Sequence, residues 1–168
     1  MSAVETMPHA QRATLTKSRR GKESLTNVYQ CLVVSESRQR RHLLMRAATD
    51  GGWDALVCSD AQSARAEANR TLVQMALVDL EGLGGVTPAG YRPFCESLTQ
   101  SQKNLLLIVC GRGNDPEEEI WARQAGAWIY LPGVSHGEQL SVLCEEGRKA
   151  AEKLVYDKAL RAAPVRRR

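Results

Sequence analysis

Two apolar runs in the sequence end in a residue that can do chemistry. "MALVD" ends at Asp79, shortly before a group of glycines, and "LLLIVC" ends at Cys110. A carboxylate in such a place can bind a ligand, and a thiol with His136 as its base can act as a nucleophile. No third group is spaced to orient His136, so the thiol pair is the weaker hypothesis. The glycines of "CGRGND" (110–115) lack the full pattern of a nucleotide-binding loop, and helix-start turns explain them better.

Short apolar runs alternate with helix-favouring segments along the body of the chain. The predicted strands are 29–36, 54–60, 75–80, 104–110 and 127–131, and the predicted helices are 38–48, 61–72, 89–102, 114–127 and about 136–162. A helix follows each strand, which requires a parallel sheet with helices on both faces. The near-continuous apolar run "LLLIV" is typical of a strand that is buried on both sides.

This alternation predicts an α/β fold. A five-stranded parallel sheet in the flavodoxin-like order 2-1-3-4-5 suits the chain length and obeys the right-handed crossover rule. The first and third strands are neighbours in that order, and ligands bind at the carboxyl ends of such a pair. Ser35, Glu36 and Asp79 are therefore expected to meet in one crevice.

The composition is that of a soluble globular protein. The 168 residues suffice for one domain with a core. No apolar run approaches the ~20 residues that a membrane span needs. The five cysteines are odd in number and widely spaced, which disfavours a disulfide framework and a zinc site. We therefore expect a cytoplasmic protein without a membrane segment.

The net charge of +4 is concentrated at the two ends of the chain. Residues 1–30 carry five basic and two acidic side chains, and residues 159–168 carry four arginines and no acid, so the body between them is mildly acidic. We expect a disordered basic tail over 1–28, a folded domain over 29–150, and a helix extension with a second basic tail over 151–168. Such tails can contact nucleic acid, anionic lipid or an acidic partner.

Four segments resemble the receiver domain of two-component response regulators. "CLVVSESRQRRHLL" is similar to its first strand and helix, "MALVDLEG" to its third strand, and "LLLIVCGRG" to its fourth strand. "ARQAGAWIYLPG" is similar to the segment that leads through the fifth strand into a lysine–proline pair. The likeness covers residues 29–150, and it rests on order and spacing more than on any one motif.

The resemblance implies a phosphoacceptor pocket in which two acids and an acceptor aspartate hold Mg²⁺. Asp79 keeps the acceptor position and Glu36 keeps one acid, so these two residues are the candidate Mg²⁺ ligands. Ser35 replaces the other acid. No other cofactor is expected.

Two further positions of the implied pocket are also changed. In the family, a Ser or Thr hydroxyl and a lysine contact the phosphoryl oxygens. Cys110 stands at the hydroxyl position, and Gly133 stands at the lysine position. Arg112 is the one nearby cation that the sequence offers as a replacement. The pocket is therefore predicted to be degenerate, and the protein is predicted not to be an enzyme.

Aromatic residues around the fifth strand are candidates for an interface. Trp128 and Tyr130 are two residues apart and are expected to share one face of the strand, and Tyr130 matches the aromatic switch position of the family. Their rings either lie partly exposed beside the fourth helix or pack under it against Trp121. The last helix is longer than the sheet needs, so its overhang can pair with a second copy or with another protein.

Three functions are open on this evidence. The first is a phosphorylation-independent pseudo-receiver that binds a protein partner, such as a signalling kinase or regulator. The second is a working phosphoacceptor that uses Asp79 and Glu36 with Mg²⁺. The third is a nucleic-acid-associated protein acting through its basic tails, which the lack of a recognition helix and of aromatic–basic interleaving disfavours.

Overall fold

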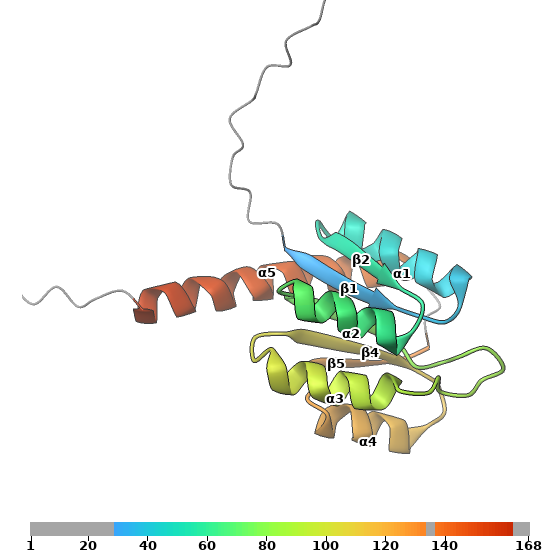
Figure 1. Ribbon diagram of the computed structural model, residues 1–168. Helices are drawn as coiled ribbons and strands as arrows, with labels where there is room; N and C mark the ends of the chain where they lie inside the picture. Colours follow the sequence, from blue (N-terminus) through green and yellow to red (C-terminus); the bar gives the residue numbers. More distant parts are fainter. Residues whose placement is uncertain (1–28, 134–136, 163–168) are drawn as a thin grey trace, which may run out of the picture.

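The computed structural model describes residues 29–133 and 137–162 (Figure 1). Both predicted basic tails and the short segment 134–136 lie outside the described residues. Within the described part, no helix is both long and apolar enough to cross a membrane.

Strands and helices alternate along the described chain. The strands are β1 (Gln30–Val34), β2 (Asp54–Cys58), β3 (Met75–Asp79), β4 (Leu106–Gly111) and β5 (Ile129–Pro132), and the helices are α1 (Arg38–Asp50), α2 (Ala61–Arg70), α3 (Tyr91–Ser101), α4 (Pro116–Gln124) and α5 (Gly137–Ala162). The strands pair in parallel in the order β2-β1-β3-β4-β5. This sheet, with helices on both faces, confirms the predicted flavodoxin-like fold.

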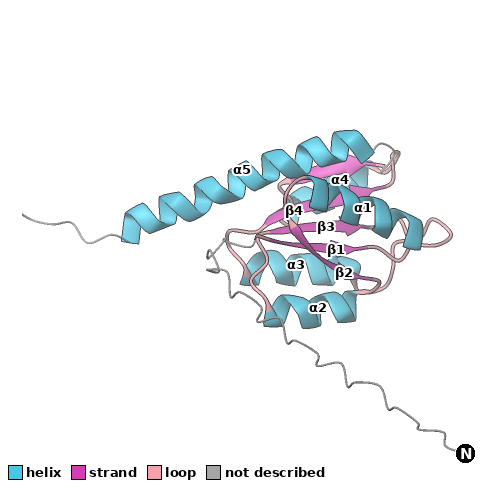
Figure 2. Cartoon of the chain, turned by 90° about the horizontal axis from the view of Figure 1, so that it is seen from above, coloured by secondary structure: helices cyan, strands magenta, loops and turns pink. Residues whose placement is uncertain are grey.

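Two hydrophobic layers hold the helices on the sheet. Figures 1 and 2 show α1 and α5 on one face and α2 and α3 on the other, and Ala122 of α4 packs in the same layer as α3. The first layer includes Leu44, Ile108 and Cys144, and the second includes Phe94 and Leu107, all of them buried. A fully buried side chain of the Leu, Ile or Phe type contributes roughly 1.5–3 kcal/mol to folding. The central strands β3 and β4 are buried along their whole length, as helices on both faces require.

Helix caps fix where the chain turns from strand to helix. Ser37 precedes α1 in an extended conformation, and its side chain accepts a hydrogen bond from the backbone N–H of Arg40. Asp60 caps α2 in the same way, and Asp115 caps α4 directly before Pro116. Each cap satisfies a backbone donor that the first turn of a helix leaves unpaired. The caps therefore place the first turns of α1, α2 and α4 beside the carboxyl ends of the strands.

Helix α5 continues beyond the sheet. Figure 1 shows its C-terminal half projecting away from the body of the molecule. Among the residues of α5 whose side chains the structure describes, Ala151 is the last that is buried, and residues 152–158 are all exposed. The helix therefore extends past the predicted domain end at residue 150.

Candidate functional site

Asp79 ends β3, and its side chain is only 1% exposed. Val34 pairs with Val78 in the register of β1 and β3, so Ser35 emerges next to Asp79. The hydroxyl of Ser35 donates to Oδ2 of Asp79 at 2.7 Å, and the backbone N–H of Glu81 donates to Oδ1 at 3.1 Å. The structure thus brings Ser35 and Asp79 together at the switch point, as the strand order predicts.

A guanidinium group completes the surroundings of Asp79. Arg40 lies in the first turn of α1 and places its Nε 2.9 Å from Oδ2 of Asp79. Its terminal nitrogens contact the carboxylate and the backbone carbonyl oxygen of Glu81. The side chain of Arg40 is 21% exposed, so the ion pair lies between the buried carboxylate and solvent. The crevice therefore contains a cation that belongs to the chain itself.

Burial is the main influence on the charge of Asp79. It raises the pKa of the carboxyl, and the hydrogen bond from Ser35 and the charge of Arg40 lower it, with a net upward direction. Because this pKa is raised in the folded state, the contribution of Asp79 to stability is greatest at low pH and falls as pH rises through the folded-state pKa. Arg40 offsets part of the cost of the ionised form.

The side chain of Glu36 binds a backbone N–H group, whereas the sequence suggests it as a ligand of Mg²⁺. Its Oε2 accepts a hydrogen bond from the backbone N–H of Leu83 at 2.9 Å, in the loop between β3 and α3. An added Cβ at Gly82 would lie 2.7 Å from the same oxygen, so the loop backbone approaches Glu36 closely. Glu36 therefore fixes the loop that borders the crevice.

The pair Glu36 and Asp79 does not fit a magnesium site in this arrangement. Mg²⁺ requires near-ideal octahedral coordination by oxygen atoms. Both carboxylate oxygens of Asp79 already have donors, the guanidinium of Arg40 stands beside them, and Glu36 is bonded to the loop. No group of three or more His, Cys, Asp or Glu residues in the described part of the chain could hold a metal ion.

Arg112 is not the cation of this crevice. Its Nη2 lies 2.7 Å from Oδ2 of Asp115, and its Nη1 donates to the backbone carbonyl oxygen of Gly85 at 3.1 Å. The prediction that Arg112 is the one cation available to replace the missing lysine is therefore wrong, because Arg40 is the residue paired with Asp79. The sequence does show three arginines and no acid in the first turn of α1, although it does not single out Arg40. The positive end of a helix disfavours such cations.

Cys110 and Gly133 take structural places in the fold. Cys110 is fully buried in the layer under α1 and α5, and burial raises the pKa of its thiol well above the usual value. Such a thiol stays protonated and is a core group. Gly133 has a φ of +83°, and its N–H donates to the carbonyl oxygen of Gly111 at 2.8 Å. A lysine in that backbone conformation would be strained.

A second buried carboxylate, which the sequence analysis did not single out, lies on α4. The side chain of Glu118 is 0% exposed. Its Oε1 accepts hydrogen bonds from the backbone N–H of Arg112 at 2.8 Å and from the hydroxyl of Tyr130 at 3.1 Å. Guanidinium nitrogens of Arg92 and Arg112 each lie 3.7 Å from Oε2. Glu118 therefore ties together the ends of β4 and β5 and the start of α3.

The aromatic residues do not form one surface. The hydroxyl of Tyr130 lies within 3.1 Å of Glu118 and of the carbonyl oxygen of Arg112. Burial and the nearby charge of Glu118 raise the pKa of Tyr130 to about 12. Trp128 precedes β5, and its ring packs against Gly147 of α5. The prediction that Trp128 and Tyr130 share a face of the strand is therefore wrong.

Trp121 lies in the same layer as Tyr130. Its Nε1 donates to Oε1 of Glu96 on α3 at 2.8 Å, and the guanidinium of Arg92 lies 4.9 Å from the centre of its ring. Trp121 therefore joins α4 to α3, on the side of the sheet opposite the helix that Trp128 contacts.

Comparison by sequence finds no relative, since no family model and no curated protein matches the chain. Comparison of structures does find similar proteins. The chain is similar to a CheY-like receiver domain protein of Methanospirillum hungatei (15% identity, TM-score 0.64), over 75% of this chain and 98% of that one. It is also similar to the chemotaxis protein CheY4 of Vibrio cholerae (20% identity, TM-score 0.60), over 72% and 98% of the two chains.

A third similar structure is that of a longer protein. NtrX of Brucella abortus, in complex with ADP, matches with 17% identity and a TM-score of 0.68. The match covers 82% of this chain and 31% of NtrX. At these identities the likeness concerns the fold alone. The chain has the fold of response-regulator receiver domains.

Proposed function

We propose that this receiver-fold chain is a signalling protein that works as a protein-interaction module and does not depend on phosphorylation of Asp79. The observation that carries the proposal is the ion pair between Arg40 and Asp79, at the position where the family holds Mg²⁺ and accepts a phosphoryl group. The substitution of Ser35 for an acid supports it, since a hydroxyl that donates to Asp79 replaces a carboxylate that would bind a metal.

Phosphoryl transfer depends almost entirely on positioning and on cations that stabilise the transferred group. In this crevice the only cation paired with Asp79 among the described residues is Arg40, and it neutralises the acceptor itself. Attack by Asp79 would require one of its oxygens to leave its present donors. These contacts favour a carboxylate with a structural role.

The surroundings of Tyr130 point in the same direction. Glu118 and the carbonyl oxygen of Arg112 hold its hydroxyl inward through contacts that do not include Asp79. The position of this aromatic side chain is thus fixed by a buried network within the domain. A surface built around α4 and β5 can therefore keep one arrangement without a phosphoryl signal.

The proposal predicts that the protein will not accept a phosphoryl group from a small donor. Full-length protein is incubated with acetyl phosphate and Mg²⁺, and its intact mass is measured. A receiver domain with a complete set of pocket residues is treated in parallel as the positive control. We expect that control alone to gain the mass of one phosphoryl group. A mass gain in this protein that disappears in Asp79→Asn would establish a working phosphoacceptor instead.

A further inference from the structure

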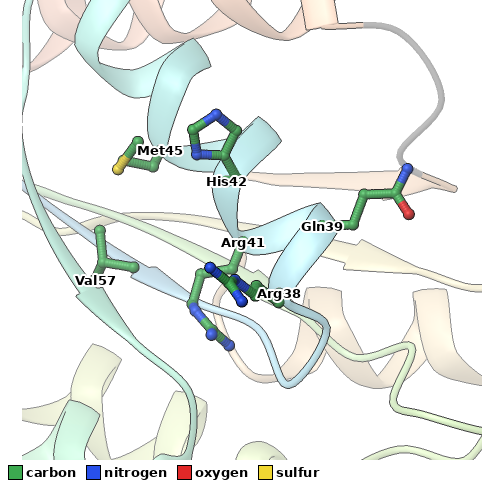
Figure 3. Close-up of a pocket in the computed structure, with 6 residues that line it drawn as sticks. All are labelled: Arg38, Gln39, Arg41, His42, Met45 and Val57. Atoms are coloured by element: carbon green, nitrogen blue, oxygen red, sulfur yellow. The ribbon is translucent and has the colours of Figure 1, made fainter.

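An open groove lies between α1 and the edge strand β2. It has a volume of about 580 Å³ and is lined by Arg38, Gln39, Arg41, His42, Met45 and Val57. Figure 3 shows Arg38, Arg41 and His42 near the start of α1 and Val57 on β2 beside them. Neither Asp79 nor its partner Arg40 lines this groove, so it is distinct from the crevice of Asp79.

The basic side chains of this groove have no acidic partner within the described residues. Arg38, Arg41 and His42 take part in none of the ion pairs found there. Arg41 donates to the backbone carbonyl oxygens of Ser35 and Glu36, at 2.7 and 3.3 Å, and not to a carboxylate. The body of the chain is mildly acidic, so this concentration of positive charge is local.

The position of the groove's arginines at the start of α1 is electrostatically unfavourable in the protein without a ligand. Arg38 and Arg41 lie in the first turn of α1, where the helix dipole is positive and an acid is favoured by about 0.3–1 kcal/mol. No acid of α1 lies in that turn to compensate. A bound anionic group would relieve this repulsion and would also meet the positive end of the helix. The groove is thus electrostatically complementary to an acidic ligand.

The apolar part of the groove indicates what kind of acidic ligand fits. Val57 is 41% exposed and Met45 is partly exposed, so an apolar side chain can be buried between them. β2 is at the edge of the sheet and pairs only with β1 among the described strands, which leaves its outer backbone groups open to an extended chain. The lining residues include no Phe, Tyr or Trp ring on which a nucleic-acid base could stack.

We propose that the groove between α1 and β2 binds a segment of a partner protein that carries acidic side chains and an apolar side chain such as leucine. Its carboxylates contact Arg38, Arg41 and His42, and an apolar side chain packs against Met45 and Val57. The inference rests on the proposed function, since it names the chemistry of the partner that the interaction module would recognise.

The test is a titration of isotope-labelled full-length protein with a synthetic peptide in which leucines interrupt runs of glutamate, followed by amide NMR. Saturable shifts are expected at Arg38, Arg41 and Val57, and the peptide with glutamine in place of glutamate should bind far more weakly. Arg38→Ala should weaken binding of the acidic peptide about fivefold, as expected for one charge pair at a surface. The matched control is Arg65→Ala on α2, an exposed arginine on the other face of the sheet, which should not change binding.

Three results would overturn the proposal. The first is the absence of saturable shifts in the groove, and the second is equal binding by Arg38→Ala and the unaltered protein. The third is tighter binding of oligothymidylate than of the peptide at the same residues, which would make the groove a nucleic-acid site. None of these three results depends on Asp79. The proposed function fails on a different observation, the uptake of a phosphoryl group by Asp79, so the two failures are distinguishable.

Discussion

Replacing Glu118 by alanine is expected to lower the free energy of unfolding by about 3 kcal/mol. The substitution leaves the backbone N–H of Arg112 and the hydroxyl of Tyr130 without their shared acceptor. It also removes the buried negative charge that faces the guanidinium groups of Arg92 and Arg112. Urea unfolding followed by circular dichroism measures the change.

Two further variants separate charge from packing at this position. Glu118→Gln keeps an acceptor of the same size but loses the charge, so its loss of stability should be smaller than that of Glu118→Ala. Glu119→Ala is the matched control, because Glu119 only pairs with Arg123 on the surface of α4 and should change stability by less than about 0.5 kcal/mol. An equal effect of Glu118→Ala and Glu119→Ala would show that the buried network does not hold β4, β5 and α3 together.

Gly51→Ala is expected to cost about 2–3 kcal/mol of stability. Gly51 ends α1 where α5 crosses it, and an added Cβ would lie 2.6 Å from Cβ of Cys144 and 2.9 Å from its backbone carbonyl carbon. The collision is with the backbone of α5, so a change of rotamer cannot relieve it and the two helices must move apart. Urea unfolding of the variant and of the unaltered protein measures the loss.

Gly113→Ala is the control for this prediction. Gly113 lies in the loop before α4, and no heavy atom approaches within 4 Å of the place where its Cβ would be. The free energy of unfolding of the Gly113→Ala variant should therefore differ from that of the unaltered protein by less than about 0.5 kcal/mol. Similar stabilities for Gly51→Ala and Gly113→Ala would mean that α1 and α5 do not pack as closely as described.

The order of elements and the sheet topology could be predicted from the sequence because each strand is a compact apolar run. The strand boundaries differ more from the prediction: strand β5 begins at Ile129, two residues later than predicted, and this shift separates Trp128 from Tyr130. The sequence "TDGGW" also predicts a turn, but it does not show that its two glycines have separate roles. Gly52 has a φ of +83°, whereas Gly51 has a φ of −76° and is needed for the close approach of α5.

The polar contacts at the site could not be predicted in the same way. Arginines 38, 40 and 41 are equivalent in the sequence, and only the folded chain shows that Arg40 is the one that reaches Asp79. Glu118 is one of three successive glutamates, and its burial depends on Gly111, where an added Cβ would collide with Glu118 and Tyr130. Both contacts join residues that only the tertiary structure brings together.

The arginines of α1 therefore have two different environments. Arg40 pairs with Asp79 in the crevice, while Arg38 and Arg41 line the groove beside β2. One short helix thus supplies both the cation that neutralises the acceptor position and the charged surface proposed to meet a partner. The proposed function depends on the first of these contacts.

The most direct test of a neutralised acceptor site is amide NMR of the full-length protein titrated with Mg²⁺ and beryllofluoride, which together mimic an aspartyl phosphate. We predict no saturable shift at Ser35, Arg40 or Asp79 at millimolar concentrations, and the same response from Asp79→Asn. Saturable shifts at these residues and at Tyr130 that vanish in Asp79→Asn would contradict the proposal and show that the crevice opens to a phosphoryl group.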